Sequence, residues 1–374
     1  MADPVLVFYH SGKYLYSESS ELYSCCAPDW RPFLRDLAHR FPDEFKVIKL
    51  NFEAGFNGLG VDGEIRQTPL HSRYPVEVRI LHGFDVIDEK ELRFRLRNSS
   101  CSLKEGFRPL VSREDYHSSF NKVLQAIVQG GFYQLNLTMP FSGRYEGGTA
   151  GAFVRYHRVF RGDFHGMMPL EDGTLISMSP ELFLEKRGEK LLSRPIKGTV
   201  EKAFGSDVQL MESEKEAAEL AMIVDLLRSD LNSVADVRHS RVNFHRELLD
   251  LGDIWHSWSE LEAESRMDLP EILYRMLPGA SVSGCPKRRA VEHILALEPW
   301  CRGFYTGVFG WWRGDDARLC VLIRSFMLLS GGEIYYHSGG GIVHNSQLDR
   351  EYRELLLKAR KISLWAPLKN PFSS

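Results

Sequence analysis

The chain has 374 residues, of which 43% are hydrophobic and 11% aromatic, so it can bury a substantial core as one large domain or two ordinary ones. Its 47 basic and 50 acidic residues give a formal charge of -3, which excludes the strongly positive field typical of proteins that bind nucleic acid or anionic membranes. The six cysteines lack zinc-like or disulfide-framework spacing, and no apolar run approaches a membrane span or a signal peptide. We therefore expect a cytoplasmic protein with reduced thiols.

The first hundred residues mix short strand-like runs with one amphipathic helix. The predicted strands are VLVFYH, FKVIKLNF and VEVRIL, and the predicted helix is RPFLRDLAHRF. A polar stretch, RNSSCSLKEG, follows them and is the candidate boundary. We accordingly divide the chain into an N-terminal part, 1–108, a main region, 109–366, and a tail, 367–374.

Beyond the boundary the pattern changes to longer helices alternating with hairpins. The segment SREDYHSSFNKVLQAIVQG predicts a helix capped by Ser112, and FYQLNLTMPF predicts the strand after it. Next, ISMSPELFLEKRGEKLLSRPIKGT predicts two strands that turn at Arg187-Gly188. This hairpin places Glu181 and Lys197 together at its open end.

The second half contains a long helix with an apolar stripe, EKEAAELAMIVDLLRSDL, and a strand pair, GFYTGVFGWW and ARLCVLIRSFMLL. A short strand, EIYYHS, the glycine run Gly339–Gly341 and a terminal helix, DREYRELLLKARKI, complete the chain. Helices interleaved with antiparallel hairpins favour an α+β fold over a doubly wound parallel sheet.

Lys197 lies in the short run RPIKGT, between Pro195-Ile196 and Gly198-Thr199. It is either an ordinary lysine of a proline- and glycine-rich turn or a positioned amine. A lysine beside an apolar strand loses stability in its charged form, which makes a nucleophilic amine available near neutral pH. Glu181 either caps a strand or, if it faces the same cleft, serves as a general acid.

Two Glu-x-x-Glu pairs, Glu216 with Glu219 and Glu351 with Glu354, each place two carboxylates on one helix face. Such pairs are most often solvated charge. The first pair, however, leads into the apolar stripe, which points it inward. Interior carboxylates repel one another unless a cation neutralises them, and an all-oxygen set suits Mg²⁺ better than zinc.

Three further features carry a functional and a structural interpretation. The glycine run is either a tight turn or a backbone concavity that binds an anion. Arg324 interrupts an apolar stretch, where an unpartnered charge is costly, so we expect it to meet an anion. His256 in IWHSW is, by itself, most simply a satisfied core histidine.

Together these segments resemble the chorismate-utilising enzymes, a family that includes anthranilate, aminodeoxychorismate, isochorismate and salicylate synthases. The similarity runs from about Ser112 to Leu364. It rests on motifs in the family's order: YQLNLT, SPE, PIKGT, KEAAELAMIVDLLRSDL, SGCPKRRAVE, the Tyr305 to Gly310 strand, the Arg324 strand and GGGIVHNSQLDREYRE. The resemblance implies large mixed, mainly antiparallel sheets packed face to face with helices outside, in α/β/β/α layers.

Two positions discriminate within the family. Anthranilate synthases usually have alanine where this chain has Lys197, and the lysine form is typical of aminodeoxychorismate synthase component I, where it is the covalent nucleophile. Isochorismate and salicylate synthases carry a water-activating lysine where this chain has Gln134. The resemblance therefore points to amination of chorismate at C4, with ammonia from a separate glutamine amidotransferase, because no cysteine here sits in a Gly-x-Cys-x-Gly elbow.

The resemblance also implies a role for each matching residue. Lys197 would be the nucleophile and Glu181 the acid. The principal Mg²⁺ ligands would be Glu219 and Glu354, with Glu216 and Glu351 close by. The substrate carboxylates would be held by Tyr305, Arg324 and the backbone of Gly339, Gly340 and Gly341. The site would be lined by Gln134, Thr199 and Ser281, and His256 would lie near the substrate ring.

Two alternatives stay open: anthranilate synthase component I or another chorismate-converting enzyme, and a non-catalytic chorismate-binding assembly protein. Several positions depart from the family's pattern, including Gly131, Ser229 and Asn345, where aspartate, asparagine and aspartate are usual. We expect these departures to affect the choice of substrate more than the fold. The N-terminal part is also shorter than in typical members, which bears on a tryptophan pocket and on glutaminase docking.

Overall fold

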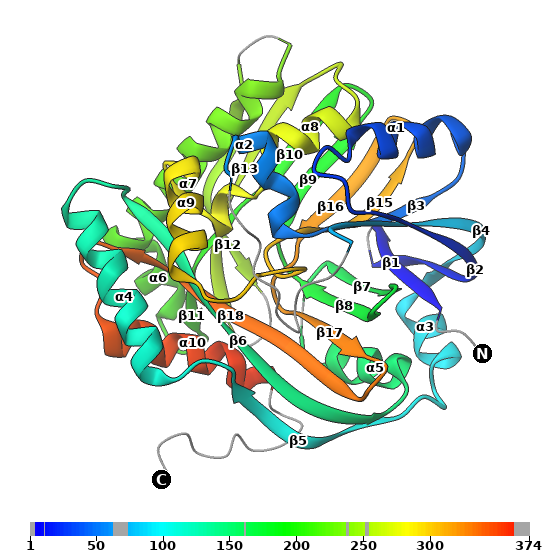
Figure 1. Ribbon diagram of the computed structural model, residues 1–374, viewed down its shortest axis with the longest axis horizontal. Helices are drawn as coiled ribbons and strands as arrows, with labels where there is room; N and C mark the ends of the chain where they lie inside the picture. Colours follow the sequence, from blue (N-terminus) through cyan, green and yellow to red (C-terminus); the bar gives the residue numbers. More distant parts are fainter. Residues whose placement is uncertain are drawn as a thin grey trace.

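The computed structural model describes residues 4–10, 12–62, 74–160, 162–236, 239–250 and 254–362. Strands form the centre and helices surround them (Figure 1). The helices are α1 (Arg31–Arg40), α2 (Phe56–Leu59), α3 (Glu89–Arg95), α4 (Arg113–Val128), α5 (Thr149–Val159), α6 (Ser206–Glu212), α7 (Glu214–Val234), α8 (Leu269–Met276), α9 (Lys287–Leu297) and α10 (Leu348–Ile362), with 3-10 turns η1 (Phe52–Gly55) and η2 (Ala280–Val282).

The strands join into one extended sheet that folds back on itself. They are β1 (Val5–His10), β2 (Lys13–Cys25), β3 (Lys46–Leu50), β4 (Val76–Asp88), β5 (Cys101–Pro109), β6 (Gln134–Gly147), β7 (Phe164–Pro169), β8 (Gly173–Ser179), β9 (Leu182–Arg187), β10 (Lys190–Arg194), β11 (Ile196–Glu201), β12 (Arg241–Asp250), β13 (Ile254–Glu264), β14 (Gly284–Cys285), β15 (Val308–Arg313), β16 (Asp316–Val321), β17 (Ser325–Leu329) and β18 (Glu333–Val343).

Strand pairing follows a path from the edge strand β12 to β5. In order, the neighbours are β12, β13, β10 (with β11 also on β13), β9, β16, β15, β3, β4, β2, β1, β7, β8, β17, β18, β6 and β5, and β14 pairs with the start of β6. Every pair within the described ranges is antiparallel, in agreement with the predicted α+β class.

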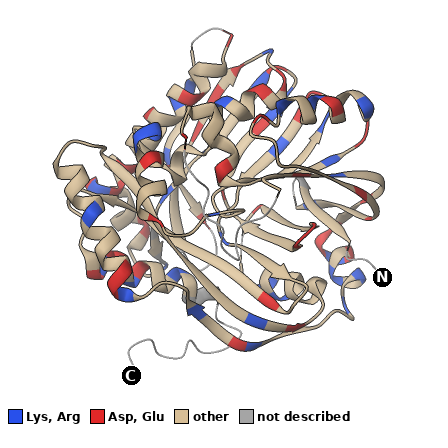
Figure 2. Cartoon of the chain, viewed as in Figure 1, with Lys and Arg blue, Asp and Glu red and all other residues tan. Residues whose placement is uncertain are grey.

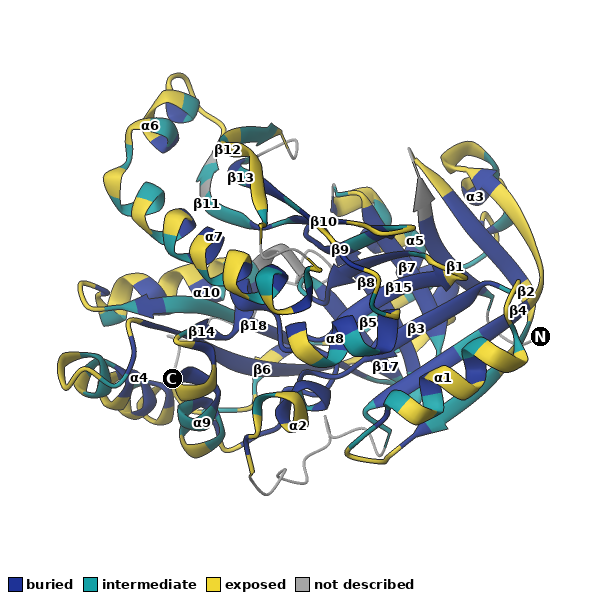
Figure 3. Ribbon diagram, turned by 90° about the horizontal axis from the view of Figure 1, so that it is seen from above, coloured by how far each residue is buried: buried dark blue, intermediate teal, exposed yellow. Residues whose placement is uncertain are grey.

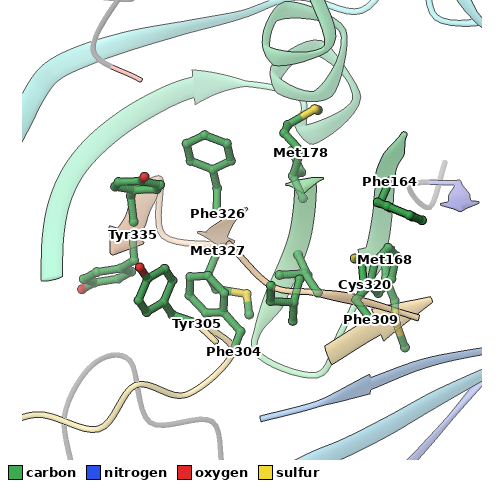
Figure 4. Close-up of a cluster of buried hydrophobic side chains, with 14 of the residues drawn as sticks. Phe164, Met168, Met178, Phe304, Tyr305, Phe309, Cys320, Phe326, Met327 and Tyr335 are labelled. Atoms are coloured by element: carbon green, nitrogen blue, oxygen red, sulfur yellow. The ribbon is translucent and has the colours of Figure 1, made fainter. Parts of the chain in front are cut away.

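Two hydrophobic clusters fill the molecule, and the strands between them are largely buried (Figure 3). One cluster joins the faces of β6, β7, β8, β17 and β18 to α4, α5 and α10, and Figure 4 shows part of it around Phe304, Tyr305 and Phe326. The other joins β3, β4, β9, β15 and β16 to α1, α7 and α8. No helix among the described residues is long and apolar enough to cross a membrane.

The predicted helices are confirmed because local signals define them. The stripe of α7 is buried throughout and packs on β13 and α8; its members are Leu220, Ile223, Val224, Leu227 and Leu231. Ser112 caps α4 by accepting a hydrogen bond from the Asp115 backbone, and Ser213 caps α7 by accepting one from the Glu216 backbone.

Lys197 lies on β11 and the glycine run is part of β18, so the turn is excluded as the alternative for each. One predicted strand was wrong. The apolar stretch around Arg324 is not one strand, because β16 ends at Val321 and β17 begins at Ser325. Arg324 itself has a φ of 51°, in the left-handed region, so the chain leaves the sheet at this residue.

The polar stretch chosen as a boundary contains the start of β5, which pairs with β6 of the main region. The division at residue 108 stays a prediction, and the tail 367–374 lies outside the described residues. The strands on the two sides of residue 108 nevertheless belong to the same sheet.

Candidate active site

Lys197 lies next to an irregularity in β11, which pairs antiparallel with β13. Lys197 is opposite Ser257 and Thr199 is opposite His256, with a shift in register between them at Gly198. The two carbonyls of this bulge are held by side chains of β13: Ser257 Oγ donates to the Lys197 carbonyl at 2.5 Å, and His256 Nδ1 lies 2.8 Å from the Gly198 carbonyl. The side chain of Thr199 lies outside the described part of the structure.

Gly198 brings the Lys197 bulge close to the first helix of the acidic pair. Its φ is 73°, and a Cβ at this position would lie 2.8 Å from Leu210 Cδ1 and 3.1 Å from Glu216 Oε2. Any other residue would be strained by the positive φ and would displace the ends of the Leu210 and Glu216 side chains. This tight contact explains the glycine of PIKGT and places Lys197 beside α7.

Glu181 lies between β8 and β9 and is 4% exposed. Burial raises its pKa to about 7, although a hydrogen bond from Ser281 and the charges of Lys197 and Arg324 act in the opposite direction. The Ser281 hydroxyl donates to Glu181 Oε1 at 2.5 Å. The result is a carboxyl that retains a proton close to neutral pH, near a lysine and an arginine.

Arg324 and Tyr305 provide donors for an anion. Arg324 lies between β16 and β17, and its guanidinium is 3.0 Å from His256 Nε2. Burial raises the pKa of Tyr305, so its hydroxyl keeps its proton, and its ring stacks on His337 at 5.0 Å between centroids. The sequence predicted a strand that includes Tyr305, but β15 begins at Val308, so Tyr305 precedes it.

The glycine run lies in β18 against β6, with Gly339 opposite Thr138 and Gly341 opposite Asn136. A Cβ at Gly341 would come within 2.7 Å of Gln134 Nε2, and one at Gly340 would lie 3.8 Å from Glu351 Oε2. The missing side chains therefore leave room for Gln134, which is 1% exposed and whose Oε1 has no hydrogen-bond partner among the residues that the structure describes.

Two helices present the four glutamates: Glu216 and Glu219 on α7, and Glu351 and Glu354 on α10. Burial, reinforced by Glu219 and Glu354, raises the pKa of Glu216, whereas Lys215 and Lys197 act in the opposite direction. Burial and the other carboxylates likewise raise the pKa of Glu351. The four side chains thus share one electrostatic environment.

Two lysines that the sequence reasoning missed lie within this acidic group. Lys215 Nζ is 3.6 Å from Glu219 Oε1 and 3.9 Å from Glu351 Oε1, so it links α7 to α10. Lys358 Nζ is 2.9 Å from Glu354 and donates to the Gly339 carbonyl at 3.1 Å, and it lowers the pKa of Glu354. Their helical spacing of four residues from Glu219 and Glu354 was the available signal.

The donor set fits a hard divalent cation. Among the described side chains, no group of three or more His, Cys, Asp or Glu residues converges at metal-binding distances, because lysines lie between the carboxylates. The donors are nevertheless all oxygens, carried by α7 and α10, and burial together with repulsion from the neighbouring carboxylates raises the pKa of Glu216 and of Glu351. A dication would relieve that repulsion, and oxygen ligands suit Mg²⁺.

Segments distant in sequence carry charges that act on one another. Figure 2 shows that many charged residues lie on the outer helices. The charge of Lys197 acts on Glu181, on Glu216 and on Glu354. An amine, a protonated carboxyl, an arginine and an acidic group together characterise a site for a small anionic substrate.

Comparison with known proteins gives the family. Residues 7–363 match the family model described as chorismate binding enzyme, and the chain belongs to this family. Aminodeoxychorismate synthase component 1 of Klebsiella aerogenes is 32% identical over 273 residues, which cover 71% of this chain and 60% of that protein. Anthranilate synthase component 1 of Thermus thermophilus is 32% identical over 268 residues, covering 68% of this chain and 57% of that protein.

The match spans about 60% of the length of the aminodeoxychorismate synthase relatives. Among solved structures, anthranilate synthase component I from Streptococcus pneumoniae superposes with a TM-score of 0.78, at 20% identity, over 97% of this chain and 91% of that one. This likeness confirms the predicted fold.

Proposed function

We propose that the protein acts as aminodeoxychorismate synthase component I, converting chorismate and ammonia to 4-amino-4-deoxychorismate with Mg²⁺ for the synthesis of 4-aminobenzoate and folate. The observation that supports this function best is the position of Lys197. Its charge acts on the protonated Glu181 and also on Glu216 and Glu354 of the acidic helices. The relatives of that name are 30 to 32% identical to this chain.

Substrate binding would use both charge types of the site. Glu219 and Glu354, with Glu216 and Glu351 close by, would hold Mg²⁺, which when bound neutralises the ring carboxylate of chorismate and orients it. Arg324 and Tyr305 would receive the enolpyruvyl carboxylate through N–H and O–H donors. The glycine run would allow the ring to approach β18 without a side-chain clash.

The chemistry would proceed in two steps. In the first, the amine of Lys197 adds to C2, both conjugated ring double bonds shift by one position, and the C4–O bond breaks as Glu181 gives its proton to the departing oxygen, so that water leaves. In the second, ammonia adds at C4, both double bonds shift back, and the C2–N bond to Lys197 breaks. Glu181 regains a proton released by the new amine.

Ammonia is expected from a separate glutaminase subunit, because the relatives are called component 1 and this sequence lacks the nucleophile elbow of a glutamine amidotransferase. The glutaminase subunit is therefore proposed as a partner of this protein.

The decisive experiment is incubation of the purified protein with chorismate, Mg²⁺ and ammonium, followed by mass analysis of the product. We expect 4-amino-4-deoxychorismate, and we expect Lys197→Ala to lose most of the activity and any trappable adduct. An unchanged rate in this variant, with no adduct on the wild type, would remove Lys197 from the mechanism.

The same assay tests the alternatives. One alternative is that the protein acts as anthranilate synthase component I, the name of its Thermus thermophilus relative. The product would then be fluorescent and would have no enolpyruvyl group. A non-catalytic chorismate-binding protein would bind chorismate and leave it unchanged even when a glutaminase is supplied.

A further inference from the structure

Two hydrogen bonds through His256 connect Arg324 to the Gly198 carbonyl, and a separate one from Ser257 holds the neighbouring Lys197 carbonyl. Arg324 lies 3.0 Å from His256 Nε2, His256 Nδ1 lies 2.8 Å from the Gly198 carbonyl, and the next carbonyl upstream, that of Lys197, accepts from Ser257 at 2.5 Å. His256 is 5% exposed. A buried imidazole thus stands between the expected anion-binding residue and the expected nucleophile.

The chemistry of the two partners determines which ring nitrogen of His256 carries the proton. A guanidinium only donates hydrogen bonds, so Nε2 must accept. A carbonyl only accepts, so Nδ1 must donate to Gly198. Both contacts are satisfied by one form alone, the neutral imidazole with its proton on Nδ1.

This neutral form excludes His256 as a proton donor to the substrate at Nε2 and favours a role in aligning Arg324. An imidazole whose Nε2 already accepts from Arg324 has no proton at that atom to give to a substrate. It does, however, hold one edge of the guanidinium while leaving other Arg324 donors free, since arginine has five N–H groups. It also holds a bulge whose glycine is already tightly packed against Leu210 and Glu216.

We propose that His256 is a positioning residue, which in its neutral Nδ1–H form aligns Arg324 for the substrate carboxylate through Nε2 and fixes the Lys197 bulge through Nδ1. Arg324, between β16 and β17, and Lys197, on β11, are far apart in the sequence, and this single ring sets both relative to each other before the substrate arrives. The identity of the carboxylate rests on the proposed function. The alignment itself rests on the contacts alone.

Two substitutions separate the two bonds, because asparagine and glutamine each retain part of the imidazole. In His256→Asn the amide nitrogen takes the place of Nδ1 and donates to Gly198, but Arg324 loses its acceptor. In His256→Gln the amide oxygen reaches the place of Nε2 and accepts from Arg324, but the bond to Gly198 is lost. His245→Asn and His245→Gln, on the edge strand β12, are the matched controls.

The binding readout is calorimetry with chorismate and Mg²⁺ without ammonia. We expect His256→Asn to weaken binding about tenfold, the loss expected for one hydrogen bond to a charged group, and His256→Gln to bind nearly as the wild type does. The second readout is the rate at which a small acylating reagent modifies Lys197. We expect the rate of Lys197 acylation to change about tenfold in His256→Gln and to change little in His256→Asn. The His245 variants should leave both unchanged.

A third readout reports on the proton directly. Long-range nitrogen–proton spectra of protein labelled at histidine should contain one neutral, Nδ1-protonated ring whose signals disappear in both His256 variants. An Nε2-protonated or doubly protonated ring, or equal effects of the two variants on both readouts, would overturn the inference. If the spectra are as expected but chorismate does not bind the wild type, the proposed function fails while the alignment stands.

Discussion

Burial raises the pKa of the Glu181 carboxyl and so prepares it to act as an acid. Because its pKa is raised to about 7, it is protonated below that pH and ionised above it. With free ammonia held constant, we expect kcat/KM to fall as pH rises through about 7, because the ionised carboxylate cannot protonate the leaving oxygen. The measurement is chorismate consumption across pH.

Ser281→Ala provides a matched variant for this pH profile. The hydrogen bond from Ser281 lowers the pKa of Glu181, so its removal should move the decline to higher pH. Glu181→Gln should be slow and should show no decline in this range. A decline unchanged in both variants would assign it to another group.

The same shift has a consequence for stability. A carboxyl whose folded pKa is raised from 4.5 to about 7 contributes stability that is complete below the lower value and is lost as pH rises through the higher one. At about 1.4 kcal/mol per pKa unit, the loss is roughly 3 kcal/mol. Urea unfolding of Glu181→Gln, which cannot ionise, should therefore show a gain over the wild type of that order at pH 8.5 but little difference at pH 4.

Lys215 acts as an internal cation among the glutamates. We expect Lys215→Met to bind Mg²⁺ several-fold more tightly in calorimetry, because the metal no longer competes with the ammonium group near Glu219 and Glu351. In the wild type, Mg²⁺ should also increase the chemical labelling of Lys215. Lys122→Met, on the exposed face of α4, is the control, and equal Mg²⁺ affinity in the two variants would contradict this role.

At the scale of elements, the start of α7 matters most, because the first turn carries Glu216. Ser213 caps this helix, and its carbonyl accepts a hydrogen bond from Arg246 at 2.8 Å. Arg246 also donates to the Leu210 carbonyl and has a φ of 62°, a strained conformation outside glycine. The junction of α6 and α7 is thus held from β12.

Ser213→Ala should lower the free energy of unfolding by about 1 kcal/mol, as for the loss of other helix caps. It should also weaken Mg²⁺ binding, since Glu216 follows directly. Ser112→Ala removes the equivalent cap of α4 and should cost similar stability without affecting the metal. Identical Mg²⁺ affinities in the two variants would separate this cap from the metal site.

Helices with a periodic apolar stripe were predicted well from the sequence. Irregularities in strands, which depend on the partner strands, were not predicted. The stripe of α7 repeats every three or four residues, which is visible in any window of the chain. By contrast, the break at Arg324 and the bulge at Gly198 arise where a strand changes partner or meets a helix. Nothing local in those segments distinguishes a turn from an irregular strand.

At the scale of the whole molecule, one buried ion pair joins parts of the chain that line the site. Arg302 donates to both oxygens of Glu298 at 2.8 Å and to the carbonyls of Val282 and Asn136. Glu298 also accepts from the backbone and hydroxyl of Thr138. The network ties β6, the η2 turn of Ser281 and the segment leading to Tyr305.

Arg302→Leu should therefore destabilise the protein by about 3 to 5 kcal/mol, because it removes the guanidinium that pairs with the buried Glu298 carboxylate. Adding Glu298→Leu should recover only part of the loss, since Thr138 then lacks its acceptor. Denaturant unfolding of both variants measures this. A single variant as stable as the wild type would show that the network does not hold the fold together.

The sequence by itself determined the family and the helices α1, α4, α7 and α10 with the Ser112 cap, and it nominated Lys197, Glu181 and the four glutamates, because motifs and helical periodicity are local properties of a chain. Only the tertiary structure decided that Glu181 is buried enough to keep a proton, that Lys215 and Lys358 lie among the glutamates, and that His256 bridges Arg324 and Gly198. Burial and hydrogen bonding depend on which distant segments pack together, and that is settled by the fold as a whole.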